Sequence, residues 1–203
     1  MWTYEKRLQF PVKITQTCPK TASLIISQFG GPDGELAASM RYLSQRYTMP
    51  CREAAGLLTD IGTEELAHLE IICAMVFQLT KDLTAEQAKT AGFDAYYTDH
   101  TTGVYPQFAS GTPFTAATFS STGDVITDLT EDLSAEEKAR TTYDNLLRLV
   151  DDPDVRDPLK FLRAREIVHF QRFGESLRKV QDELNSKNFY AFNPAFDRKK
   201  KRK

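Results

Sequence analysis

The sequence predicts an all-α fold, a four-helix bundle with a long crossover between the second and third helices. Long segments repeat apolar residues at three-and-four spacing, which is the pattern of amphipathic helices. Two of these segments carry a Glu-x-x-His unit within the apolar face. An irregular stretch, residues 92–122, separates the helical segments into two pairs. A chain of 203 residues with 41% hydrophobic residues can bury one core, so we expect a single domain over residues 1–203.

The first helix is predicted to follow an N-terminal arm. Residues 1–17 combine aromatic and basic side chains with Pro11, and we expect them to lie extended on the bundle or on a neighbouring subunit. A helical pattern then covers residues 21–46, with an interruption in its middle. The interrupting residues are Gly30, Gly31, Pro32 and Gly34. Because proline breaks or bends a helix, we expect this first helix to have two halves.

The second helix is predicted over residues 52–79. Its apolar face consists of Ala54, Leu58, Ile61, Ile72 and Val76. A short helix over residues 84–91 is indicated by Thr84 and Gln87, which have the spacing of a capping box. Residues 92–122 are rich in Gly, Ser, Thr, Tyr and Phe and are long for a loop in a compact domain, so we interpret them as the crossover.

The third and fourth helices complete the bundle. The apolar period predicts them over residues 123–150 and 154–186, so that the bundle spans about residues 20–186. Residues 187–203 combine an aromatic stretch with a lysine-rich run, and we expect a basic, solvated tail there.

Composition restricts the partners. The 26 Lys and Arg residues nearly balance the 28 Asp and Glu residues, which predicts no nucleic-acid partner and no anionic membrane. The charged N-terminus lacks the apolar core of a signal peptide and no stretch approaches a membrane span, so we expect a soluble, unexported protein. Cys18, Cys51 and Cys73 form no disulfide framework, which indicates a reducing compartment.

The two Glu-x-x-His units lie where apolar residues belong. Glu65 and His68 fall on the apolar stripe of the second helix, and Glu166 and His169 on that of the fourth. The spacing puts both members of each unit on one helical face. Burying ionised carboxylates is costly unless something compensates their charge. A bound cation is the simplest compensation.

Two more carboxylates belong to the same pattern. Glu136 falls on the apolar stripe of the third helix, together with Tyr143. Glu35, on the first helix, shares a face with the small Ala38 and with Tyr42, whose hydroxyl can reach a ligand. One glutamate from each of two helices, plus Glu-x-x-His from each of the other two, is the known ligand arrangement of ferritin-like dimetal carboxylate proteins.

This ligand set favours manganese or iron over thiophilic metals, without choosing between the two. A single Glu-x-x-His occurs often by chance, but two such units with two further core-facing glutamates point to a metal site. We interpret Glu64 and Glu70 as solvated neighbours of the first unit, and His100 as a surface histidine.

Three long motifs surround the candidate ligands. They are GG-x-x-GE ending at Glu35 with SMRYLSQ after it, DIGTEELAHLE around Glu65 and His68, and VRDPLKFLRAREIVHF around Glu166 and His169. With these motifs the chain resembles the manganese catalase family, from the N-terminal KRLQF to about Glu183. The resemblance implies disproportionation of hydrogen peroxide to water and dioxygen, with two manganese ions per chain as cofactor.

The resemblance also implies roles for individual residues. Glu65 would bridge the two metals. Glu35 and His68 would complete the first metal, and Glu136 and His169 the second.

Two further residues would act beside the metals. Glu166 would be the catalytic base that accepts and returns protons, rather than a permanent ligand, and Tyr42 a hydrogen-bonding partner.

Two departures from the family pattern stand out. Ala135 occupies the position before Glu136 where matching members carry a basic residue, so we expect substrate access to differ. The chain also lacks the long C-terminal extension of typical members, and in this it resembles the short spore-coat members. The resemblance to the family implies a homo-oligomer, with the hexamer of the longer enzymes as its model. The likeness to the short members implies other spore-coat proteins as partners, in the cytoplasm or the spore coat.

Two other functions remain open from the sequence. One is a structural coat protein whose bundle merely holds metal, which the short chain and Ala135 favour. The other is a di-iron oxidase, peroxidase or iron-handling protein, in which Glu166 would bind the metal directly.

Overall fold

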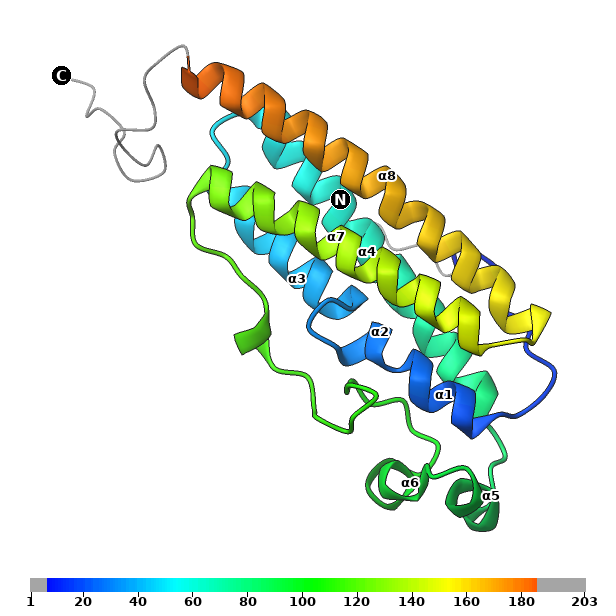
Figure 1. The fold of residues 1–203 in the computed structure, drawn as a ribbon. Coiled ribbons are helices and arrows are strands. Elements are labelled where there is room, and N and C mark those ends of the chain that lie inside the picture. The colour runs from blue at the N-terminus through cyan, green and yellow to red at the C-terminus, as the bar shows by residue number, and fades with distance from the viewer. Residues whose placement is uncertain (1–6, 186–203) are drawn as a thin grey trace.

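The computed structural model describes residues 7–185, and over this range the protein is a bundle of long helices (Figure 1). A broken first helix packs along α4, and α7 and α8 run antiparallel side by side. The predicted all-α four-helix bundle with a long crossover is confirmed, since α4 ends at Thr80 and α7 begins at Val125. The helices are α1 (Pro19–Ile25), α2 (Ser27–Gly30), α3 (Glu35–Gln45), η1 (Arg46–Thr48), α4 (Arg52–Thr80), α5 (Ala85–Thr90), α6 (Asp94–His100), η2 (Ala116–Thr118), α7 (Val125–Leu149) and α8 (Pro153–Asn185).

The first helix is broken more than predicted, into α1, α2 and α3 rather than two halves. Close backbone approach explains the break. A Cβ on Gly30 would lie 2.2 Å from the backbone nitrogen of Gln107 in the crossover, and one on Gly34 would lie 2.7 Å from the carbonyl oxygen of Ser27. Only glycine fits at such positions. The break makes Glu35 the first residue of α3.

The apolar core consists of two clusters separated along the bundle. On α4, Leu58 and Ile61 belong to one cluster, and Ile71 and Ile72 to the other. On α8, Leu159 and Leu162 lie on one side of the same gap and Phe173 on the other. The Glu-x-x-His units of both helices fall between these positions. The core is therefore interrupted by polar side chains at mid-height.

The crossover contains more helix than its sequence indicates. The predicted short helix is α5, and its capping box is present: Thr84 Oγ1 accepts a hydrogen bond from Gln87 N at 3.2 Å. The additional helix is α6, which lies beside α5 beyond the end of the bundle (Figure 1). Its His100, expected on the surface, is half-buried and stacks on Tyr105, with ring centroids 4.1 Å apart.

The described part of the N-terminal arm lies along α4 and α8. Ile14 N donates to Gln78 Oε1 at 2.7 Å, and Phe10 stacks on Phe161 with ring centroids 4.9 Å apart. The arm therefore contacts both α4 and α8. Residues 1–6 of the arm and the expected basic tail, residues 187–203, lie outside the described residues.

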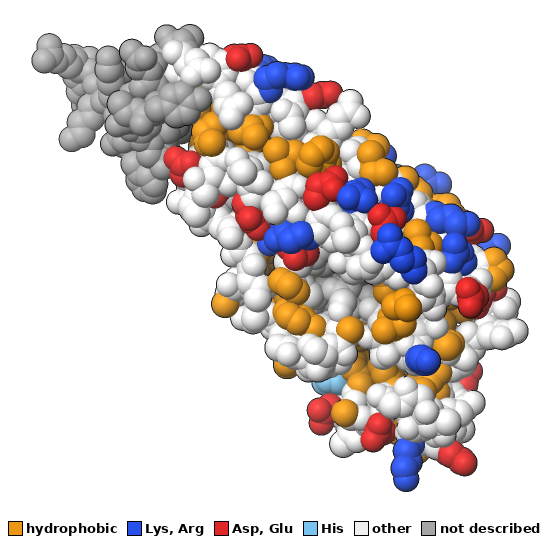
Figure 2. Space-filling model, in the orientation of Figure 1, with side chains coloured by type: hydrophobic (Ala, Val, Ile, Leu, Met, Phe, Trp, Pro, Cys, Tyr) orange, Lys and Arg blue, Asp and Glu red, His pale blue; other side chains and the backbone are white. Residues whose placement is uncertain are grey.

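Charges on the surface are balanced locally. Figure 2 shows basic side chains beside acidic ones on one face of the molecule. Arg140 Nη1, for example, lies 2.8 Å from Asp144 Oδ2, which Arg163 also contacts. Within residues 7–185, no helix has both the length and the apolar character needed to cross a membrane.

Candidate metal centre

Four helices bring the six candidate ligands into the gap between the two apolar clusters. Each helix contributes through the face that its apolar stripe turns inward. All six side chains are buried, with relative exposures of 2% or less. They are Glu35 on α3, Glu65 and His68 on α4, Glu136 on α7, and Glu166 and His169 on α8.

Glu65 lies at the centre of the cluster, between the two histidines. Its Oε2 is 2.6 Å from His68 Nδ1, and its Oε1 is 2.8 Å from His169 Nδ1. The two imidazole rings stack with centroids 5.5 Å apart. One carboxylate therefore faces both imidazoles, with one oxygen for each.

Each histidine has a second glutamate on its other side. Glu35 Oε2 lies 3.6 Å from His68 Nδ1, and Glu136 Oε2 lies 3.5 Å from His169 Nδ1. The site thus has two similar halves, each with one glutamate and one histidine, around the shared Glu65.

A tyrosine holds the outer glutamate of each half. The Tyr42 hydroxyl donates a hydrogen bond to Glu136 Oε1, and the Tyr143 hydroxyl donates one to Glu35 Oε1. Tyr42 was expected near a ligand. Tyr143 was assigned only to the apolar stripe of its helix, because its spacing fits the core and nothing within one helix shows which partner the hydroxyl meets.

Glu166 lies close to the centre. Its carboxylate belongs, with Glu65, His68 and His169, to a group whose potential ligand atoms all lie within 4.8 Å of one another. Burial, followed by the charges of Glu35 and the other glutamates, raises the pKa of Glu166 well above its ordinary value. A carboxyl in this position holds a proton readily, and it is also near enough to contact a metal.

The pKa values of the ligands show how unbalanced the cluster is without a cation. Burial and then the charge of Glu65 raise the pKa of Glu35 to about 7. Burial opposes protonation of His169, but Glu65 and the other carboxylates outweigh it and raise the pKa of His169 to about 12. Two protonated imidazoles cannot neutralise four buried carboxylates, whereas two divalent ions with neutral imidazoles would do so.

Several atoms aimed into the cluster lack a hydrogen-bond partner. Buried polar atoms are nearly always hydrogen-bonded, so such atoms need an explanation. Within the described part of the chain they include Glu136 Oε2 and Glu166 Oε1. They also include Glu65 Oε1 and His169 Nδ1, which lie 2.8 Å apart but are not aligned for a hydrogen bond. Carboxylate oxygens and imidazole nitrogens are donors that manganese and iron accept, so this donor set fits a metal centre.

Glu64 corrects the sequence interpretation. The sequence predicted a solvated side chain, but this side chain is only 16% exposed. It faces both imidazole rings from outside the cluster. Its Oε2 lies 3.1 Å from His169 Nε2, and its Oε1 lies 3.7 Å from His68 Nε2. Arg165 Nε lies 2.8 Å from Glu64 Oε1, and Gln9 Nε2 donates to the same oxygen at 2.7 Å. Partial burial opposes ionisation, but the hydrogen bond with His169 and the nearby His68 ring hold the pKa of Glu64 well below its usual range.

These contacts assign different tasks to the two nitrogens of each ring. Nδ1 of both histidines points at the cluster, and Nε2 points at Glu64. A histidine that binds a metal usually donates its other N–H to a carboxylate. The fold and site together define a ferritin-like helical bundle with a buried carboxylate and histidine cluster suited to metal ions.

Comparison with known proteins identifies the family. A family model, "Manganese containing catalase", matches residues 1–199, and the chain belongs to this family. It is 52% identical to Protein CotJC of Bacillus subtilis over 190 residues. This alignment covers 94% of this chain and 100% of that protein. It is 35% identical to a probable manganese catalase of Clostridium acetobutylicum, over 93% of this chain and 85% of that protein.

Solved structures agree with this assignment. The fold matches KatB, a manganese catalase from Anabaena, with a TM-score of 0.82 and 30% identity over 89% of this chain and 81% of that one. A bacterioferritin-related protein from Bacteroides fragilis shares the fold, with a TM-score of 0.55 at 15% identity over 83% of this chain and 88% of that one. The predicted ferritin-like fold and the resemblance to manganese catalases are thereby confirmed.

The lengths of the relatives differ. The chain covers 100% of the length of Protein CotJC. It covers only 71% of the length of the manganese catalase of Bacillus subtilis, to which it is 28% identical. The expected likeness to a short form of the family therefore agrees with these matches.

Proposed function

We propose that this protein disproportionates hydrogen peroxide to water and dioxygen at two manganese ions bound in the cluster. The observation that carries the proposal is the buried set of four carboxylates and two imidazoles, arranged as two similar halves around Glu65. Membership in a family described as manganese-containing catalases supports the metal and the reaction.

The assignment of ligands follows the two halves of the site. Glu65 would be shared by the two ions, because each of its oxygens faces a different histidine. Glu35 and His68 would hold one ion, and Glu136 and His169 would hold the other. Two bound manganese ions would supply the two-electron chemistry that oxidises one peroxide and reduces the next.

Glu166 is proposed as the catalytic base. Oxidation of one peroxide to dioxygen releases two protons, and reduction of the second to two waters consumes two. The Glu166 Oε1 atom has no hydrogen bond within the described residues, so it is available to take one of these protons and return it. The raised pKa of the buried carboxyl suits this exchange.

The two tyrosines position the outer ligands. Tyr42 and Tyr143 each donate to one oxygen of Glu136 and Glu35, which leaves the other oxygen of each glutamate directed at a histidine. In this scheme Tyr42 orients a ligand, as expected from the sequence, and Tyr143 does the same for the opposite half.

Oxygen evolution tests the proposal directly. Protein expressed with manganese should contain about two ions per chain and release dioxygen from peroxide. The double variant His68→Ala, His169→Ala should lose both the metal and the activity. The control is His100→Ala, which removes the third histidine of the chain, on α6, and should keep both. Metal-loaded protein that releases no dioxygen would reject the proposal.

A structural role is the second candidate. It is favoured by the complete coverage of the short Protein CotJC and by Ala135, which is buried beside Glu136 where a basic side chain was expected from the family pattern. In this case the bundle would hold metal and assemble with itself, as a hexamer, or with other coat proteins in the spore coat. Metal-loaded, inactive protein that assembles into oligomers would support it over catalysis.

An iron protein is the third candidate. The position of Glu166 favours it, since this carboxylate lies in the same tight group as Glu65 and both histidines and is placed to bind metal directly. Iron occupancy after purification, with consumption rather than release of oxygen, would support an oxidase or peroxidase. Manganese occupancy with release of oxygen would exclude it.

A further inference from the structure

A row of buried polar side chains lies between α3 and α7, next to the metal centre. Arg41 and Gln45 are one helical turn apart on α3, and Asp132 is one turn before Glu136 on α7. All four have relative exposures of 1% or less. A buried guanidinium and a buried carboxyl group outside the ligand set need a physical reason, because each is costly to remove from water.

Much of this row has no hydrogen-bond partner in the described part of the chain. Nε and Nη1 of Arg41 are unpaired, as are both carboxylate oxygens of Asp132 and Oε1 of Gln45. Ordered water molecules usually complete the hydrogen bonding of such groups. The row therefore offers donors and acceptors that small hydroxylic molecules can satisfy.

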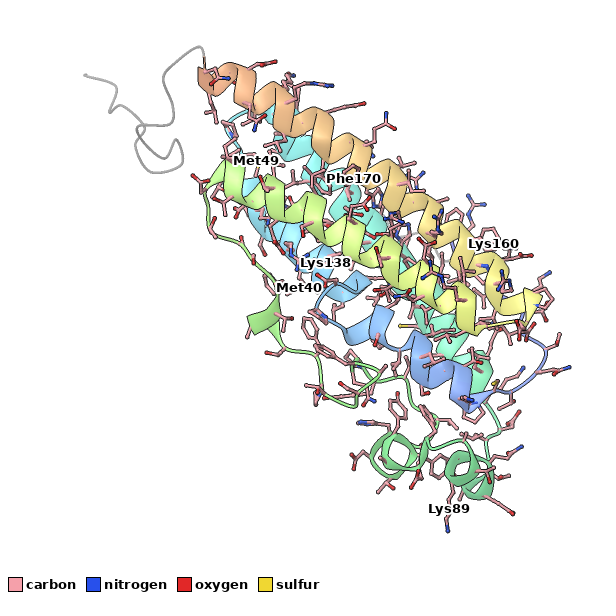
Figure 3. The ribbon with its side chains drawn as sticks, viewed as in Figure 1. Met40, Met49, Lys89, Lys138, Lys160 and Phe170 are labelled. Carbon is pink, nitrogen blue, oxygen red and sulfur yellow. The ribbon has the colours of Figure 1, made fainter. Side chains whose placement is uncertain are left out.

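The outer end of the row reaches the surface through Asp33. Nη2 of Arg41 donates to the carbonyl oxygen of Pro32 at 3.2 Å and lies 4.0 Å from Asp33 Oδ1. The same oxygen of Asp33 lies 2.9 Å from Lys138 Nζ, and the Lys138 side chain is 46% exposed. Figure 3 shows Lys138 on the side of α7 that borders α3. An exposed ion pair of this kind is weak and opens easily.

The inner end of the row reaches the metal centre. Tyr42, the neighbour of Arg41 on α3, donates to Glu136, and Asp132 lies one turn from Glu136 on α7. We propose that this row, from Lys138 and Asp33 through Arg41 and Asp132, is the route by which hydrogen peroxide enters and water leaves the metal centre. The proposal rests on the proposed catalase function.

The chemistry of the row suits this substrate. Hydrogen peroxide, like water, both donates and accepts hydrogen bonds. The guanidinium N–H groups of Arg41 can bind its oxygens, and the oxygens of Asp132 can accept from its hydroxyls. Peroxide can therefore replace water along the row without leaving either buried group unpaired.

Substitutions at the outer end test the route by kinetics. Lys138→Trp places a bulky side chain over the entrance and should lower kcat/KM for peroxide at least tenfold, with unchanged manganese content. The matched control is Lys160→Trp, which replaces another exposed lysine paired with an aspartate, Asp157, at 2.9 Å on α8. Both lysines are labelled in Figure 3. An unchanged kcat/KM in Lys138→Trp would overturn the proposal.

A crystal structure of the full chain provides a test that does not depend on activity. Ordered water at Arg41 Nε and Nη1 and at both oxygens of Asp132 would support the route. Direct pairing of Arg41 with Asp132, with no water between α3 and α7, would overturn it and make the two residues a structural ion pair. Absence of oxygen evolution from metal-loaded wild-type protein would instead reject the proposed function, and the water positions would still decide on the route.

Discussion

At the scale of single residues, the site depends on what each nitrogen of its two histidines contacts. Nδ1 of His68 and His169 faces Glu65, and Nε2 of both faces Glu64. One half-buried carboxylate thus orients two imidazoles. Glu64 and His68 are four residues apart on one helix, so their contact could be predicted from the sequence. The contact of Glu64 with His169 joins two different helices, so it could not be predicted in this way.

We expect Glu64→Gln to weaken manganese binding by about 10- to 100-fold, which is the usual effect of removing such a supporting carboxylate. The amide cannot accept from both imidazoles with the same strength, so the rings lose their fixed orientation. The measurement is manganese affinity by competition with a chelator.

The matched control for this change is Glu70→Gln. It removes the same charge from the same helix, and neither histidine ring forms a hydrogen bond with Glu70 within the described residues. Equal losses of affinity in the two variants would show that Glu64 acts only through its general charge.

At the scale of the elements, the break in the first helix determines where its candidate ligand, Glu35, lies. Glu35 is the first residue of α3, with Gly34 as its N-cap. The break depends on Gly30, where the crossover backbone passes too close for any side chain. The position of Glu35 is therefore coupled to the packing of a segment more than seventy residues later in the chain.

Gly30→Ala should destabilise the fold by about 1–3 kcal/mol, the usual cost of forcing an extra carbon into a packed site. The crossover must move, because the new Cβ would lie 2.2 Å from the backbone nitrogen of Gln107. The free energy of unfolding in urea measures the loss.

Gly56→Ala is the matched control for Gly30→Ala. Gly56 lies on α4, and a Cβ added there would meet nothing within 4 Å, so alanine should stabilise the helix by about 0.5–1 kcal/mol. Similar effects of both substitutions would contradict the packing argument.

At the scale of the whole molecule, we expect folding and metal binding to be linked through the buried carboxylates. The two apolar clusters enclose the site from both ends, so each candidate ligand must leave water when the bundle forms. Without metal, the charge of the cluster is balanced by protons. With metal, those protons are released.

The metal-free protein should therefore lose stability as the pH rises from about 5 to about 7. The folded pKa of Glu35 is raised to about 7 from an ordinary value of 4.5, by burial and then by Glu65. A raised pKa means that the folded state binds the proton more tightly, so the stabilisation is present below the unfolded pKa and is lost through the folded one. Urea denaturation at several pH values measures it.

Manganese should reverse this trend, because the ion competes with protons and binds more tightly at higher pH. At a concentration about a hundred times its dissociation constant it should stabilise the fold by about 2.7 kcal/mol. In the metal-free variant Glu35→Gln the loss between pH 5 and 7 should be smaller. A metal-free wild type whose stability rises over this range would contradict the charge argument.

Helical periodicity already determined the all-α class and the four segments of the bundle, and it placed Glu35, Glu65, Glu136 and Glu166 on inward faces. These features follow from spacing within one helix, which sets the side chains that share a face. The crossover was harder to predict, because α6 has only seven residues and its sequence lacks the apolar spacing of an amphipathic helix.

Only the packed structure decided the contacts between helices. It shows that Glu65 lies between two histidines, that Tyr143 holds Glu35, that Glu64 faces both imidazoles and that Arg41 and Asp132 are buried beside the site. These contacts depend on how far one helix is rotated and shifted along another, and the packing of side chains between helices sets both.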